Sequence, residues 1–164
     1  MKKCIIFCIS LVLVGAGCIG TGPEEDAAVD YGFVVTPSAS NTVIDLSDQD
    51  FTSFPSYILE RTDIEELDIS GNLMTGALPA EIRQLSRLRV LDASDNQFTG
   101  VPAEIGQLEN LEVLDFSNNQ LTGIPHELGN LKALQILDLS GNDISEFDLE
   151  IIREGLSPDV EIRL

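Results

Sequence analysis

The side chains with the clearest potential for chemistry are five aspartates that recur at intervals of 23 or 24 residues, each followed two positions later by a serine. If each aspartate lies at the same place in a repeated strand, the carboxylates stack about 4.8 Å apart. Such a row of like charges is unfavourable unless something compensates it. Three explanations are open: a cationic or amide-rich ligand, a bound calcium ion, or local hydrogen bonds from serine and backbone groups. The aspartates are Asp45, Asp68, Asp92, Asp115 and Asp138, and the serines are Ser47, Ser70, Ser94, Ser117 and Ser140.

Side chains for catalysis are otherwise scarce. His126 is the only histidine, and we expect it on the surface after Pro125. All three cysteines lie at or before position 18, so neither a zinc site nor a histidine-activated nucleophile can be assembled from the rest of the chain. The glycines follow turns and do not form a phosphate loop. We therefore predict that the protein is not an enzyme and holds neither a cofactor nor a metal.

Cys18 needs a different role. It follows a segment with a positively charged start, about ten apolar residues and then small residues, which is typical of a secretory signal. The apolar stretch is too short for a membrane helix, which needs about 20 residues. Ala16 and Gly17 before Cys18 resemble the lipobox of prokaryotic lipoproteins. The resemblance implies removal of residues 1–17 as a signal peptide and lipid attachment at Cys18. The alternative is an ordinary secretory signal with an incidental cysteine.

Residues 18–40 have the composition of a flexible linker, rich in Gly, Pro, Ser and acidic residues. A linker of this length lets the following domain stand away from a membrane. Tyr31, Phe33, Val34 and Val35 interrupt the polar run. We predict that they form an N-terminal flap over the open apolar end of that domain.

A repeated frame accounts for residues 41–164. Asn72, Asn96, Asn119 and Asn142 follow one another at spacings of 24, 23 and 23 residues, and each closes the pattern LxxLxLxxN. A short strand in each unit then alternates inward and outward residues. Each asparagine lies where the chain leaves the strand, and its amide can satisfy backbone groups there, so we predict a structural role for this Asn column. The inward residues are Leu67, Leu91, Leu114 and Leu137, followed by Ile69, Ala93, Phe116 and Leu139.

The pattern resembles the leucine-rich repeats of the plant-receptor and Ras-group types. The resemblance implies an α/β solenoid, a short horseshoe arc with a parallel sheet of about six short strands on the concave face and short helices or turns on the convex face. The repeats run near 41–63, 64–87, 88–110, 111–133 and 134–156, with a terminal strand over 157–164.

The second half of each unit supplies the convex side. Pro79, Pro102 and Pro125 suit the first turn of a short helix, because the missing N–H would be unpaired there. In the fifth unit Asp148 replaces the proline, and we expect Phe147 and Ile151 to keep apolar places.

The terminal strand can be placed by adding one repeat of 23 residues. From Leu137 and Leu139 this leads to Val160 and Ile162. We expect these two residues to lie on a sixth strand and to face the core of the domain.

The charge balance is strongly acidic, with 9 basic against 28 acidic residues and a formal net charge of −19. Loss of Lys2 and Lys3 with the signal would leave 7 basic residues and a net charge of −21. A surface this negative repels nucleic acid and anionic lipid headgroups. We interpret most of the charge as favouring solubility.

Together these features predict a non-enzymatic module that binds a protein or peptide, with a basic ligand suiting the charge. We predict a monomer, secreted across the membrane and lipid-anchored at a prokaryotic cell envelope. The alternatives are a structural or self-associating envelope component and a cytoplasmic signalling scaffold. The predicted ligand-binding residues are the outward strand residues Val90, Asp92, Ser94, Val113, Asp115, Ser117, Ile136 and Asp138.

Overall fold

The computed structural model describes residues 42–164. The predicted signal peptide, the lipid-attachment residue Cys18 and the predicted tether and flap over 18–40 lie outside the described residues.

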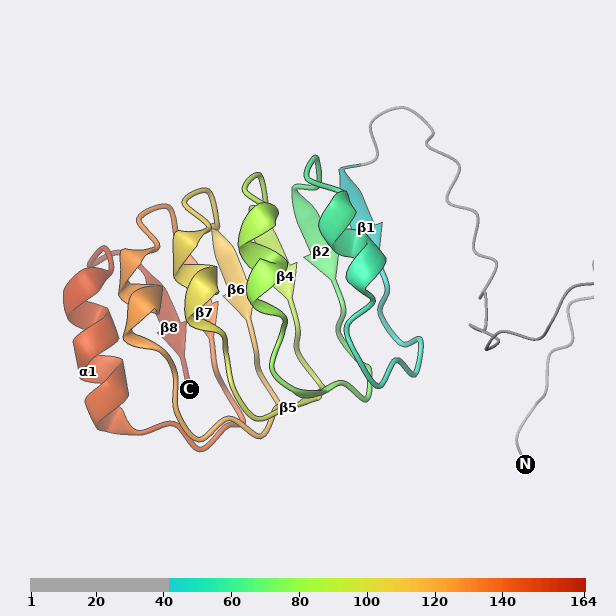
Figure 1. Cartoon of the computed structure of the whole chain (residues 1–164). Helices are drawn as coiled ribbons and strands as arrows, with labels where there is room; N and C mark the ends of the chain where they lie inside the picture. The colour runs from blue at the N-terminus through green and yellow to red at the C-terminus, as the bar shows by residue number, and fades with distance from the viewer. Residues whose placement is uncertain (1–41) are drawn as a thin grey trace, which may run out of the picture. The chain divides into compact units, whose positions relative to one another are not determined.

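Six short strands form a parallel sheet on one side of the molecule (Figure 1). The order of the strands in the sheet follows their order in the chain, so each repeat adds one strand beside the last. This is the solenoid and the number of strands that the repeat pattern predicts. The strands are β1 (Val43–Asp45), β2 (Glu66–Asp68), β4 (Val90–Asp92), β6 (Val113–Asp115), β7 (Ile136–Asp138) and β8 (Glu161–Arg163).

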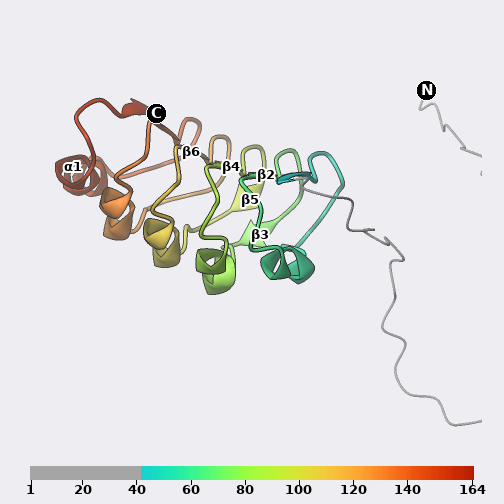
Figure 2. The same cartoon turned by 90° about the horizontal axis from the view of Figure 1, so that it is seen from above.

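Short helices line the opposite side, as the view from above shows (Figure 2). Four are 3₁₀ helices of five residues, and the last is an α-helix of ten residues. They are η1 (Ser56–Glu60), η2 (Ala80–Gln84), η3 (Ala103–Gln107), η4 (His126–Asn130) and α1 (Glu146–Gly155). Two further strands of two residues, β3 (Thr75–Gly76) and β5 (Gln97–Phe98), pair with each other between the large sheet and the helices.

The prolines lie one position earlier than expected. Pro79, Pro102 and Pro125 are the N-cap residues of η2, η3 and η4 and not part of the first turn. Their φ angles of −66° to −71° combine with extended ψ angles of 139° to 147°. The proline therefore ends the incoming loop, and its carbonyl accepts the first helical hydrogen bond, for example from the Ile82 amide at 3.0 Å.

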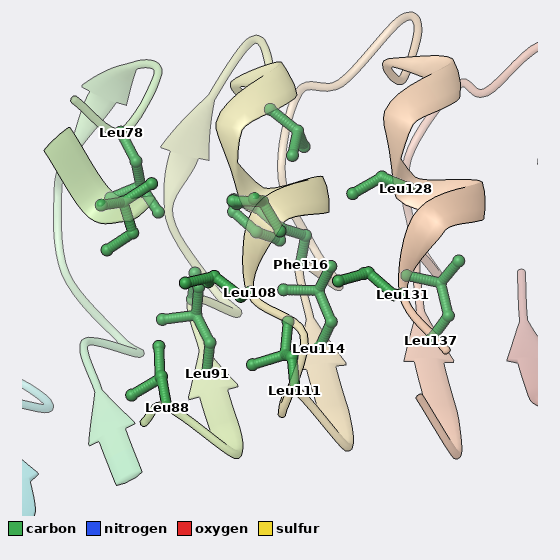
Figure 3. Close-up of a cluster of buried hydrophobic side chains, with 14 of the residues drawn as sticks. Leu78, Leu88, Leu91, Leu108, Leu111, Leu114, Phe116, Leu128, Leu131 and Leu137 are labelled. Atoms are coloured by element: carbon green, nitrogen blue, oxygen red, sulfur yellow. The ribbon is translucent and has the colours of Figure 1, made fainter. Parts of the chain in front are cut away.

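The core fills the space between the sheet and the helices. Leu91 and Leu114 from the strands meet Leu108 and Leu131 from the helical side there (Figure 3), and all four are fully buried. Phe98 and Phe116 pack edge to face with ring centroids 5.7 Å apart. Burial of each such side chain contributes about 1.5 to 3 kcal/mol relative to exposure, so stacking of repeats supplies the stability that one repeat lacks.

The last repeat departs from the 23-residue spacing. Leu137 lies opposite Ile162, 25 residues further on, so the expected alignment of Leu137 with Val160 and of Leu139 with Ile162 is wrong. The cause is α1, because a full α-helix takes up more residues than the 3₁₀ helices of the other repeats. Val160 and Ile162 still pack against the core, but only partly buried.

Helix α1 also shows that the apolar positions expected in the fifth unit were wrong. Leu149 and Ile152 are the buried residues of α1. Phe147 is 67% exposed and Ile151 only half-buried, so neither occupies the core place that we expected. The period of 3.6 residues in the α-helix moves the inward face away from the positions that the shorter helices use.

Within residues 42–164, no helix has the length and apolar character needed to span a membrane.

Candidate ligand-binding face

The outward residues of the six strands stack into two neighbouring columns. Strand pairing sets Val90 beside Val113 and Val113 beside Ile136, and we call these three residues the apolar column. Pairing sets the five aspartates side by side in the same way, and we call Asp45, Asp68, Asp92, Asp115 and Asp138 the acidic column. An aliphatic stripe therefore runs along the sheet with a row of carboxylates beside it.

Local hydrogen bonds hold each carboxylate of the acidic column. Oδ1 of every aspartate accepts a bond from the backbone N–H of the serine two residues later, at 2.8 to 3.0 Å. The serine hydroxyl also donates to Oδ1 at 2.6 Å for Asp45, Asp68, Asp92 and Asp138. The column thus contains the local hydrogen bonds that were one of the three expected ways of compensating its row of like charges.

An arginine side chain lies beside the last aspartate of the acidic column. Arg163 of β8 lies opposite Asp138, and its Nη1 is 3.4 Å from Asp138 Oδ2. Its Nε donates to Glu161 Oε1 at 2.7 Å. Sequence reasoning missed Arg163 because the 23-residue repeat assigns this position to Glu161 rather than to Arg163.

The carboxylates of the column differ in their electrostatic surroundings. Burial raises the pKa of Asp115 above its ordinary value, and the charges of Asp92 and Asp138 add to this although Ser117 opposes it. Burial also acts to raise the pKa of Asp138, but hydrogen bonds from Ser140 and Arg163 outweigh it and the pKa is lowered. The pKa of Asp45 is lowered by its hydrogen bonds from Ser47.

Accessibility divides the predicted ligand-binding residues into two groups. Ser94, Ser117 and Asp138 are only 8% exposed each, so they contribute little surface to a ligand. The accessible residues are Val90, Asp92, Val113, Asp115 and Ile136, all half-buried. The structure therefore gathers all eight residues on one face and leaves five of them available for contact.

The asparagines join neighbouring repeats. Nδ2 of Asn119 donates to the carbonyls of Ala93, Phe116 and Ser117 at 3.0 to 3.1 Å, and Oδ1 accepts from the Phe98 amide at 2.9 Å. Its amide is thus shared between its own repeat and the preceding one. Corresponding bonds are made by Asn72, Asn96 and Asn142.

A polar hollow is lined by residues that precede strands β2, β4, β6 and β7 in the sequence. It measures about 480 Å³ and is lined by Glu65, Arg87, Arg89, Asn110, Glu112 and Ala133. Arg89 and Glu112 are joined by two parallel hydrogen bonds of 3.0 Å. These residues did not enter the sequence prediction, because their positions just before each strand carry no fixed residue type.

No group of three or more histidine, cysteine or acidic side chains within residues 42–164 is arranged to hold a metal ion. His126 is exposed on η4, and its Nε2 lies 3.7 Å from Asp148 Oδ1.

Comparison with protein families places the repeats in a known group. Residues 63–85 and 94–144 match family models described as leucine-rich repeats. A search of curated proteins finds no significant match.

Solved structures give similar folds. A leucine-rich-repeat protein of Leptospira interrogans is 43% identical with a TM-score of 0.64, over 69% of this chain and 28% of that chain. The BIR3–SERK2 complex of Arabidopsis thaliana gives 33% identity and a TM-score of 0.58, over 62% and 56% of the two chains. The leucine-rich-repeat ectodomain of the Arabidopsis receptor kinase GASSHO1/SCHENGEN3 was solved in complex with CASPARIAN STRIP INTEGRITY FACTOR 2. It gives 34% identity and a TM-score of 0.53, over 56% of this chain and 11% of that chain. The chain spans less than two thirds of the length of each of these three proteins.

Proposed function

Because this chain is a leucine-rich-repeat protein, we propose that it is a non-enzymatic module that binds a protein or peptide through the outward face of its parallel sheet. The observation that carries the proposal is the accessible apolar column with the acidic column beside it. Two of the similar solved structures are complexes, one of a leucine-rich-repeat ectodomain with CASPARIAN STRIP INTEGRITY FACTOR 2 and one of BIR3 with SERK2, which supports this class of partner.

The chemistry of the face favours a basic and partly apolar ligand. Val90, Val113 and Ile136 offer aliphatic surface, and Asp92 and Asp115 lie directly beside it. The contact between Arg163 and Asp138 gives a precedent within the chain, because it engages the carboxylate oxygen that the serine does not use. A lysine or arginine of the ligand would approach Asp92 and Asp115 in the same manner.

The size of the face limits the affinity. Six strands at the parallel spacing span about 25 to 30 Å, so the contact area lies at the small end for protein complexes. The acidic surface speeds the encounter with a basic ligand and makes it sensitive to salt. We therefore propose a modest affinity with fast, salt-dependent association.

The location of this module is a separate part of the proposal. The charged start, the short apolar stretch and the small residues before Cys18 support export and lipid attachment at that cysteine. The domain would then be presented on the outer side of a prokaryotic cell envelope, at the end of a tether over 18–40.

A charge-reversal experiment tests the ligand-binding face. Peptides that bind the wild-type chain are selected from a random library, and we expect enrichment of lysine, arginine and aliphatic residues. Asp92→Lys with Asp115→Lys should then weaken their binding far more than Glu104→Lys with Glu127→Lys. The second pair lies on η3 and η4 and changes the net charge equally. Comparable losses from both pairs would mean that net charge attracts the peptides, and the proposed face would be wrong.

A further inference from the structure

The last strand of the sheet leaves an edge that no other strand covers within residues 42–164, because β8 pairs only with β7. Figure 1 shows β8 and α1 together at this end of the solenoid. Leu164 is 61% exposed there, and Val160 and Ile162 are only partly buried. A hollow of about 350 Å³ lies beside them, lined by Arg153, Leu156, Ser157, Pro158, Val160 and Ile162. An exposed edge of this kind is a template for a further strand.

The residues along this edge are complementary to themselves when read in the opposite direction. Val160, Ile162 and Leu164 are apolar and alternate with Glu161 and Arg163. In an antiparallel pair centred on Ile162, Glu161 of one copy faces Arg163 of the other, and Val160 faces Leu164. The apolar residues then share one face of the joined sheet and the two ion pairs share the other.

We propose that β8 forms such an antiparallel pair with β8 of a second copy of this chain, around a twofold axis at Ile162. Parallel pairing in this register would place Glu161 beside Glu161 and Arg163 beside Arg163, which is unfavourable. A shift by one residue would set charged side chains against the apolar face. The antiparallel register is therefore the one that satisfies both faces, and a twofold contact closes after two copies.

The side chains at this edge retain the capacity for a second contact. Arg163 uses Nε for Glu161 and Nη1 for Asp138, and its Nη2 has no partner among the described residues. Nη2 can donate to Glu161 of the second copy. Leu164 of the second copy would lie next to Val160, beside the hollow at the end of the core. The proposed dimer differs from the monomer expected from the sequence, and it does not depend on the proposed ligand-binding face, which stays open in it.

Charge reversal at the two central positions tests the pairing. The full chain is solubilised in detergent, and light scattering that subtracts the detergent mass gives the protein mass. We expect twice the mass of a single mature chain for the wild type. Glu161→Arg sets arginine against arginine, and Arg163→Glu sets glutamate against glutamate. The dissociation constant of the dimer should therefore rise about tenfold or more for each variant alone. A mixture of the two variants restores both cross-pairs and should recover the dimer mass.

The matched control is Arg83→Glu, which changes the net charge as Arg163→Glu does but lies on η2. It should leave the wild-type mass unchanged. A wild-type chain that remains a monomer at every concentration would overturn the proposal. So would single variants that dimerise as well as the wild type, or a mixture that stays monomeric.

Discussion

Arg163 Nη1 lies 3.4 Å from Asp138 Oδ2, which makes Asp138 the one member of the acidic column with a cationic neighbour in the sheet. Asp115, one repeat earlier, has Asp92 and Asp138 on its two sides instead. The pKa of Asp115 is raised, chiefly by burial and further by these two charges, whereas hydrogen bonds from Ser140 and Arg163 outweigh burial at Asp138 and lower its pKa.

Asp115→Asn should stabilise the protein at neutral pH. Because the folded-state pKa of Asp115 is raised, its ionised form is less favourable in the folded than in the unfolded state, and this penalty is present above the folded pKa. The amide removes the charge and keeps an oxygen for the Ser117 N–H. We expect a gain of no more than about 1 kcal/mol, because the site is half-exposed. Thermal unfolding at several pH values should show the gain disappearing below the unfolded pKa of about 3.9.

The control for this experiment is Asp45→Asn, since the pKa of Asp45 is lowered. Its ionised form contributes stability above the unfolded pKa, and that contribution is lost as the pH falls through the folded pKa. Asp45→Asn should therefore lower the melting temperature at pH 7. A shift of the same sign for both variants would contradict the assignment of opposite environments.

Asn119→Ala should destabilise the domain by about 1 to 3 kcal/mol, the cost of leaving buried backbone groups without partners. The side-chain amide of Asn119 donates hydrogen bonds to the carbonyls of Ala93 and Phe116 and accepts one from the Phe98 N–H, and these partners lie in two adjacent repeats. Denaturant unfolding measures the loss. Asn110→Ala removes a single exposed bond to the Ser86 carbonyl and should cost less than about 1 kcal/mol. Equal stability of the Asn119 variant and the wild type would show that the column does not support the turns.

Gly106→Ala should cost about 1 to 3 kcal/mol because η3 and η4 pack too closely for a methyl group. A Cβ at Gly106 would overlap the Glu127 carbonyl oxygen. Gly100→Ala is the matched control, because its nearest neighbour would be Ala77 Cβ at 4.0 Å. The melting temperature should fall for the first variant and hardly change for the second. If Gly106→Ala melts no lower than Gly100→Ala, the close contact does not limit the packing.

Cys18→Ser should release the protein from the membrane fraction if Cys18 carries the lipid. Cell fractionation followed by intact-mass measurement gives the result, with Cys8→Ser as a control inside the apolar stretch. The wild-type mass should correspond to a chain that starts at Cys18 with lipid attached. An unmodified wild-type chain that begins at another residue would refute the anchor.

The repeat frame made most of the fold predictable. An inward residue such as Leu91 or Leu114 recurs at a fixed spacing, and only a solenoid of stacked strands buries such a stripe. The last repeat was less predictable, because the sequence does not show that its helix is longer than the others. Because of this longer helix, Ile162 rather than Val160 lies opposite Leu137, and the position of Arg163 beside Asp138 could not be predicted.

The candidate site was predictable only in part. Alternation in the strands assigns Asp92 and Asp115 to one outward column, but it leaves open what holds their charges. The answer depends on the bond from the Ser94 amide to Asp92 Oδ1 at 3.0 Å, which requires the local backbone geometry. The exposure of only 8% at Ser94 and Ser117 likewise depends on packing between repeats.

The close contact at Gly106 also bears on the curvature of the solenoid. Backbone hydrogen bonds fix the separation of the strands, so the bend between two repeats depends on how far apart their helices stand. Gly106 and Gly129 allow close approach, whereas Arg83 occupies the equivalent place in η2. Bulkier residues at these two positions would splay the convex side and tighten the arc, which would narrow the inner radius available to a ligand. Small residues buried between the convex-side helices thus influence the shape of the opposite face without touching it.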